Sequence, residues 1–152
     1  MAQGVDFLQS ILEQFSLARA DANQYSPLTL AYIGDSIFDA VVKTVVVESG
    51  NCPANLLQKK TTRYVKAVAQ AEMIDGLLPL LSEEETNIFR RGKNAKPYNK
   101  AKNATYYTYL KATGLEALVG YLYLKGNPER AVELIRLGMK LIDEKKQGET
   151  IS

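Results

Sequence analysis

Hydrophobic residues recur at three- to four-residue steps along nearly the whole chain, which is the spacing of amphipathic α-helices. The first such stripe predicts a helix over residues 5–18. After a polar loop, Ser26 offers an N-cap and Pro27 a first helical residue, which predicts a second helix from 27 to about 48. Valines between 41 and 47 are also typical of a strand, but no second strand-like segment can pair with them, so a helix is expected.

The remainder of the chain continues this pattern. A third helix is expected from about 53 to 78, and Ser82–Glu85 fits a capping box that starts a fourth. A polar loop over 92–103 then precedes a fifth helix, and residues 126–128 end it and start the last one. The tail, 147–152, is expected to be flexible. The sequence therefore predicts an all-α helical bundle.

The chain length sets the number of domains. At 152 residues the chain is long enough for one domain with a sizeable core and too short for two. We therefore expect a single domain over residues 1–152, with its core from about 5 to 146.

The composition excludes several kinds of chemistry. The chain has no histidine, so it has no Ser-His-Asp triad, Cys-His dyad or histidine-ligated metal. A single cysteine, Cys52, excludes an internal disulfide and fits a reducing compartment. No export signal is apparent, and the longest apolar run, Ala117–Leu124, is too short to cross a membrane. These features predict a soluble, cytoplasmic protein whose metal ligands, if any, are oxygens that favour Mg²⁺ or Mn²⁺.

Basic residues are concentrated in one segment. Between Glu85 and Glu116 the chain carries +7 and no acid, although the net charge of the whole protein is only +2. Such a block is typical of a surface that binds phosphates, and also of an ordinary solvated loop. The residues we expect to contact nucleic acid are Arg90, Arg91, Lys93, Lys96, Lys100 and Lys102. Four nearby tyrosines, which would stack on bases or pack in the core, are Tyr98, Tyr106, Tyr107 and Tyr109.

Two acids lie within apolar helical segments, where a carboxylate is costly unless it meets a cation, donors or a metal. They are Asp35 and Glu116, and each has a glycine nearby, Gly34 and Gly120, that would allow two helices to approach closely. A shared metal site is one interpretation. In the other, Glu116 belongs to a capping box with Thr113 and Asp35 pairs with an arginine.

Two segments resemble the ribonuclease III family. Ile33-Gly-Asp-Ser-Ile-Phe38, preceded by Leu30-Ala-Tyr32, is similar to the family's signature helix, and Leu115-Glu-Ala-Leu-Val-Gly-Tyr121 is similar to its second catalytic helix. Arg90-Arg-Gly-Lys-Asn-Ala95 and Lys102-Asn103 resemble a loop of the Mini-III branch, which has a catalytic domain without a separate double-stranded-RNA-binding domain. We expect no such second domain in this chain.

The resemblance implies a ribonuclease III-type endonuclease domain in which Asp35 and Glu116 are catalytic and hold Mg²⁺, with Mn²⁺ as a substitute. The wider family has two further acids, and this chain has Ala31 and Thr113 in their places. Asp39, one turn after Asp35, and Thr113 are candidates for an outer shell around the metal. The ordinary alternative for Asp39 is a residue on a polar helix face.

These features predict a magnesium-dependent endonuclease that hydrolyses phosphodiester bonds in double-stranded RNA. The resemblance further implies a homodimer that matures large-subunit (23S) ribosomal RNA, with a ribosomal protein as a candidate for presenting the precursor RNA. The alternative is a non-catalytic RNA-binding or ribosome-assembly protein of the same fold. A helical adaptor accounts for neither the two acids nor the basic segment.

Overall fold

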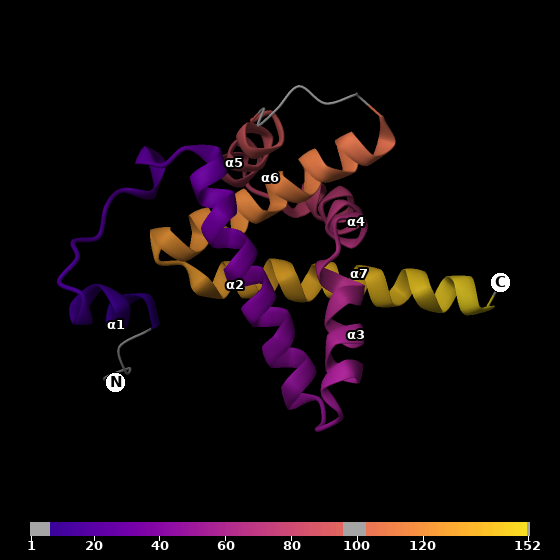
Figure 1. Ribbon diagram of the computed structural model, residues 1–152. Coiled ribbons are helices and arrows are strands. Elements are labelled where there is room, and N and C mark those ends of the chain that lie inside the picture. The colour runs from indigo at the N-terminus through magenta and orange to yellow at the C-terminus, as the bar shows by residue number, and fades with distance from the viewer. Residues whose placement is uncertain (1–6, 96–102, 152) are drawn as a thin grey trace.

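A computed structural model describes residues 7–95 and 103–151 of the chain. Every regular element in these ranges is helical, and the helices pack around α6, which crosses the middle of the molecule (Figure 1). The elements in chain order are α1 (Phe7–Gln14), a 3₁₀ turn (Ala22–Gln24), α2 (Pro27–Glu48), α3 (Ala54–Val65), α4 (Ala67–Leu77), a 3₁₀ turn (Leu78–Leu80), α5 (Glu83–Lys93), α6 (Ala104–Lys125) and α7 (Pro128–Ile151). The all-α prediction is confirmed.

Capping signals explain where α2, α5 and α6 begin and where α6 ends. The Ser26 hydroxyl accepts a hydrogen bond from the Thr29 N–H, and Pro27 opens α2 where the sequence predicts it. Ser82 and Glu85 form the expected capping box at the start of α5. Asn103 caps α6, and Gly126 ends it in the left-handed conformation, which glycine adopts without strain.

The expected helix over 53–78 is wrong, because the structure divides it into α3 and α4 at Lys66. The Lys66 backbone is extended, with ψ 151°. The side-chain amide of Gln70 donates to the Val65 carbonyl at 3.2 Å and so replaces a donor that a continuous helix would supply. Neither proline nor glycine marks this break, so the hydrophobic pattern alone continues through it.

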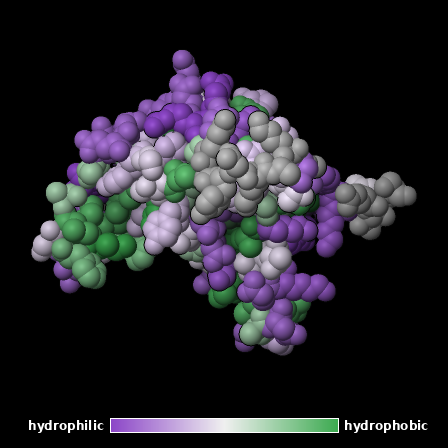
Figure 2. Space-filling model, turned by 45° about the horizontal axis from the view of Figure 1, so that its top comes forward, coloured by the Kyte–Doolittle hydropathy of each residue, from purple (hydrophilic) through white to green (hydrophobic). Residues whose placement is uncertain are grey.

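The first helix ends earlier than expected. It covers Phe7–Gln14 and stops before residue 18, and Ser16 has a positive φ of 55° just after it; residues 5 and 6 of the predicted 5–18 lie outside the described residues. Helix α7 continues to Ile151, past the start of the tail that the sequence predicts to be flexible. Hydrophobic residues gather on the side of the molecule where α1 lies (Figure 2), and Phe7, Phe15 and Leu17 are exposed there.

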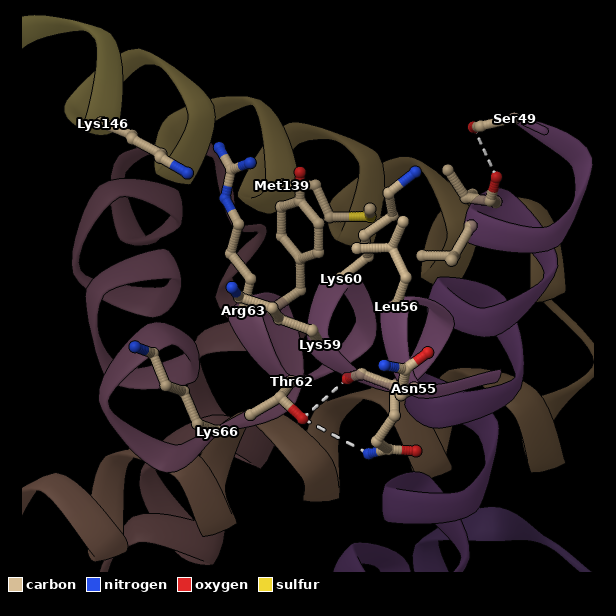
Figure 3. A pocket seen from close by; sticks show the side chains of 14 residues that line it. Ser49, Asn55, Leu56, Lys59, Lys60, Thr62, Arg63, Lys66, Met139 and Lys146 are labelled. Atoms are coloured by element: carbon tan, nitrogen blue, oxygen red, sulfur yellow. Dashed lines mark hydrogen bonds between the residues drawn. The ribbon is translucent and has the colours of Figure 1, made fainter. Parts of the chain in front are cut away.

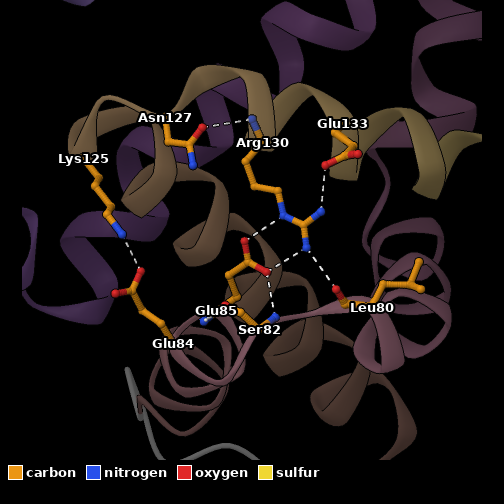
Figure 4. A network of polar contacts seen from close by, with 8 residues as sticks. All are labelled: Leu80, Ser82, Glu84, Glu85, Lys125, Asn127, Arg130 and Glu133. Atoms are coloured by element: carbon orange, nitrogen blue, oxygen red, sulfur yellow. Dashed lines mark hydrogen bonds and ion pairs between the residues drawn. The ribbon is translucent and has the colours of Figure 1, made fainter.

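A buried ion pair joins α5 to α7. The Arg130 guanidinium donates to both carboxylate oxygens of Glu85 at 2.8 Å, to Glu133 at 2.7 Å and to the Leu80 carbonyl at 3.0 Å (Figure 4). Glu85 is 6% exposed, and its partner Arg130 holds the pKa of this carboxyl below the usual range. The network fixes the start of α7 against α5, and both helices pack beside α6.

Candidate active site

Two glycines allow α2 and α6 to cross at backbone contact. A Cβ placed on Gly34 would lie 1.7 Å from the Glu116 carbonyl oxygen, and one on Gly120 would lie 2.0 Å from the Leu30 carbonyl oxygen. No side chain fits at either position without separating the helices. The sequence-based expectation that these glycines permit a close approach is confirmed.

This crossing brings the carboxylates of Asp35 and Glu116 together. Burial, the hydrogen-bonding contact with Asp35 and the negative charge of Asp35 together raise the pKa of Glu116 to about 8. Two carboxyl groups this close favour one shared proton or a cation between them. Asp35 is exposed, although its helical segment is apolar, whereas Glu116 is half-buried.

The ordinary explanations of these two acids do not hold. Thr113 lies ten residues inside α6, where its hydroxyl donates to the Tyr109 carbonyl at 3.0 Å, so it does not start a helix with Glu116. Among the ion pairs that join the described residues, none contains Asp35 or Glu116. Their proximity therefore requires another explanation.

Gln70 of α4 is a member of this site that the sequence analysis missed. Its side chain is 2% exposed, and its hydrogen bond to Glu116 lowers the pKa of that carboxyl, against the larger effect of burial. Its Oε1 is buried without a hydrogen-bond partner in the part of the chain that the structure describes. An amide within an amphipathic helix looks like any polar-face residue, so only the fold distinguishes it.

The other residues that the sequence analysis considered for the metal site are Asp39, Thr113 and Ala31. Asp39 pairs with Lys43 one turn away on α2, at 3.0 Å, which matches an ordinary polar-face residue. Thr113 and Ala31 are both buried. Among the described residues, no group of three or more acids, cysteines or histidines could hold a metal ion. Any metal here would depend on two carboxylates, a neighbouring amide, water and substrate.

The predicted basic segment lies only partly within the described residues. Arg90 and Arg91 are exposed at the end of α5, and the Lys93 ammonium lies 6.0 Å from the centre of the Phe89 ring. Lys111 pairs instead with Asp75, at 3.0 Å. Tyr106 and Tyr107 meet edge to face, and Tyr107 and Tyr109 are exposed, so these three tyrosines are not simply core residues. Lys96, Tyr98, Lys100 and Lys102 lie outside the described residues.

Comparisons with known proteins agree with this arrangement. Residues 28–127 match the model of the ribonuclease III domain, a range that includes both carboxylates and the two glycines. A solved protein of similar fold is FN1578 from Fusobacterium nucleatum, with a TM-score of 0.64 and 29% identity over 85% of this chain and 98% of that one. The fold and the crossing helices are thus those of a ribonuclease III-type domain.

Two relatives show to which branch of the ribonuclease III family the chain is similar. The chain is 46% identical to Mini-ribonuclease 3 of Thermoanaerobacter sp. over 78% of this chain and 84% of the relative. It is 40% identical to Mini-ribonuclease 3 of Clostridium tetani over 90% of each. The chain belongs to the Mini-ribonuclease 3 branch of the ribonuclease III family, whose members are endoribonucleases. Among its described helices, none is long and apolar enough to span a membrane.

Proposed function

We propose that this endoribonuclease hydrolyses double-stranded RNA and depends on Mg²⁺, which Mn²⁺ can replace. The observation that carries the proposal is the pairing of Asp35 with Glu116 at the glycine crossing of α2 and α6. Two acids on different helices, far apart in sequence, share a site that is open on one side. Neither acid has the cationic partner that a structural role would supply, in the part of the chain that the structure describes.

The side chains at this site fit a hard divalent cation. Asp35 and Glu116 would hold the ion, and the unpartnered Oε1 of the neighbouring Gln70 offers a further oxygen. Bound there, the ion would supply an activated water and would stabilise charge on the scissile phosphate. The chain has no histidine, so it offers no imidazole as a general base near neutral pH.

The two carboxylates have different roles in this proposal. Asp35 is exposed, so it can meet a phosphate group that approaches from solvent. Glu116 is half-buried and fixed by the helix crossing, so it anchors the position of the ion. Gln70 restricts the Glu116 carboxylate from the side of α4.

Substrate binding would depend on charge and shape. A-form RNA exposes phosphates and 2′-hydroxyls, and proteins recognise the duplex mainly by these groups. The exposed Arg90 and Arg91, with Lys93, supply phosphate contacts at the end of α5. Lys96, Lys100 and Lys102 remain predicted contacts.

We also propose that the protein acts as a homodimer. Several large hydrophobic side chains of α2 are exposed, above all Tyr32 at 81%. By contrast, Phe38, Val42 and Val46 of the same helix are buried within one copy. Val47 remains exposed near the end of α2. A two-fold interface through α2 would cover these groups and supply one site for each RNA strand.

The biological part of the proposal is maturation of large-subunit (23S) ribosomal RNA in the cytoplasm, with a ribosomal protein presenting the precursor. Membership of the family supports the role in RNA maturation, and the geometry of the site supports phosphodiester hydrolysis. A non-catalytic RNA-binding protein is the alternative, and the retained carboxylate pair favours the enzyme.

A cleavage assay tests the proposal. Purified protein is incubated with a long RNA duplex in Mg²⁺, in Mn²⁺ and in chelator, beside single-stranded RNA of the same sequence. Cleavage of the duplex in either metal and none in chelator is expected. An Asp35→Asn protein should bind the duplex without cutting it. Cleavage that persists in chelator, or in the Asp35→Asn protein, would contradict the assignment of a metal site to Asp35 and Glu116.

A further inference from the structure

A second strongly basic surface lies on α3, outside the segment that the sequence analysis selected. Between Glu48 and Glu72 the chain has four basic residues and no acid. These four residues, together with Lys146 of α7, line a groove of about 880 Å³ between the end of α2, α3 and α7 (Figure 3). Among its described lining residues there is no carboxylate.

The groove has the donors that phosphate oxygens require. Its cations are Lys59, Lys60, Arg63, Lys66 and Lys146. Lys59, Arg63 and Lys66 follow one another at four and three residues, so they form a stripe along one face of α3. Amide and hydroxyl groups of Asn55, Gln58 and Thr62 stand among them. Arg63 also pairs with Asp143, at 2.5 Å, whereas Lys59, Lys60 and Lys66 belong to no ion pair among the described residues.

The groove continues from the candidate active site along two paths. Through α4, Lys66 lies one helical turn before Gln70, whose side chain contacts Glu116. Through α2, Val46 in the groove wall comes eleven residues after Asp35, which places it about 20° from Asp35 around the helix axis and about 16 Å along it. The basic groove and the carboxylate pair therefore lie on one side of α2.

We propose that this groove binds the phosphate backbone of the RNA duplex beyond the scissile bond, as a second contact separate from the α5 end. The inference rests on the proposed function, because a strand placed on Asp35 and Glu116 would continue along α2 toward the lysines of α3. A row of cations with no acid among the described lining residues, of which Lys66 lies one helical turn from Gln70, is complementary to successive phosphates of that strand.

The test compares two double variants with the same loss of charge. Lys59→Gln/Lys60→Gln removes two exposed groove cations, and Arg136→Gln/Lys140→Gln removes two exposed cations of α7 that do not line the groove. Binding to a long RNA duplex is titrated in chelator, so no cleavage occurs, at several salt concentrations. Each lost phosphate contact should reduce the slope of log affinity against log salt by about one.

The groove variant should therefore lose about two units of slope, and the control variant should lose less than one. In Mg²⁺, the groove variant should also need more duplex for half-maximal cleavage. Equal slopes for the parent and the groove variant would overturn the inference. So would a change in sedimentation without a change in RNA affinity, which would assign the groove to a second copy or another protein. If the parent cuts no duplex at all, the proposed function fails instead, and the slopes still decide whether the groove binds RNA.

Discussion

Glu116 lies in surroundings that favour the neutral form of its carboxyl group. Its pKa is raised to about 8 by burial and by Asp35, against an ordinary value of 4.5. Between these two pH values the folded protein binds a proton that the unfolded chain has released, so stability without metal falls as the pH rises. A residue that lowers the stability of the folded state in this way is more typical of a functional site than of a structural one.

Replacing Glu116 by glutamine should therefore stabilise the metal-free protein at high pH. At pH 5 the parent carboxyl is already neutral in the folded state, and the melting temperatures of parent and Glu116→Gln should nearly coincide. At pH 9, in chelator, Glu116→Gln should melt higher, and in Mg²⁺ it should cut no RNA. Glu144→Gln on the exposed face of α7 serves as the matched control. A Glu116→Gln protein that melts well below the parent at pH 9 and still cuts RNA would contradict the assignment.

The sequence predicted the acids and glycines of the site but not its amide. Asp35 and Glu116 were selected because acids are rare in apolar helices, and the glycines beside them indicated the crossing. Gln70 was missed, because its burial and its contact with Glu116 depend on the break between α3 and α4. The exposure of Asp35 was also missed, since a helix pattern does not show which turn of a helix its neighbours leave uncovered.

At the level of elements, the crossing of α2 and α6 depends on two residues without side chains. A methyl group at Gly34 would overlap the backbone of α6, and backbone cannot rotate away as a side chain can. The helices must therefore separate, which changes the distance between the two carboxylates as well as the packing. Stability and activity should fall together.

Gly34→Ala should destabilise the protein by about 1–3 kcal/mol or more, the usual cost of overpacking a core. It should also abolish cleavage in those molecules that still fold. Gly148→Ala in α7 is the control, because a Cβ there meets no atom within 4 Å and alanine favours a helix. Urea unfolding and the duplex-cleavage assay measure both effects. Full activity in Gly34→Ala would mean that the close approach does not position the site.

The Glu85–Arg130 pair connects three elements and gives a second prediction at this scale. Arg130→Met leaves the Glu85 carboxylate buried without its cation, so it should cost about 3–5 kcal/mol. Glu85→Gln should cost less, because Arg130 is partly exposed and keeps its ion pair with Glu133. Replacing both, as Glu85→Gln/Arg130→Met, should recover part of the loss, because neither charge then remains at the site. Denaturant unfolding of the four proteins forms a double-mutant cycle. Additive losses would show that the pair does not act as a unit.

The pH dependence of this pair has the opposite sign to that of Glu116. Arg130 lowers the pKa of Glu85 in the folded state, so its contribution is complete above the unfolded value of 4.5. It is lost as the pH falls through the lower, folded value. The parent should therefore lose more stability than Glu85→Gln on acidification below pH 4.5, and equal losses would contradict the pairing.

On the scale of the whole molecule, the all-α fold and its single core follow from the hydrophobic periodicity, but the boundary between core and surface does not. Phe38, Val42 and Val46 alternate along α2 with Val45 and Val47, yet only the first three are buried against the other helices. The sequence shows that α2 has more apolar positions than the single stripe of an amphipathic helix. The fold is needed to show which part of that surface one copy leaves uncovered.

The exposed part of α2 predicts the oligomeric state. At micromolar concentration the protein should sediment at about twice its 16.9 kDa chain mass. Tyr32→Glu places a charge on a side chain that is 81% exposed in one copy, so each copy should still fold while the dimer dissociates. Val132→Glu, on an exposed hydrophobic residue of α7, should leave the dimer intact. Because each copy carries one carboxylate pair, the monomeric Tyr32→Glu protein should lose paired cuts in the two RNA strands. A parent that remains monomeric and makes paired cuts would contradict the two-fold arrangement.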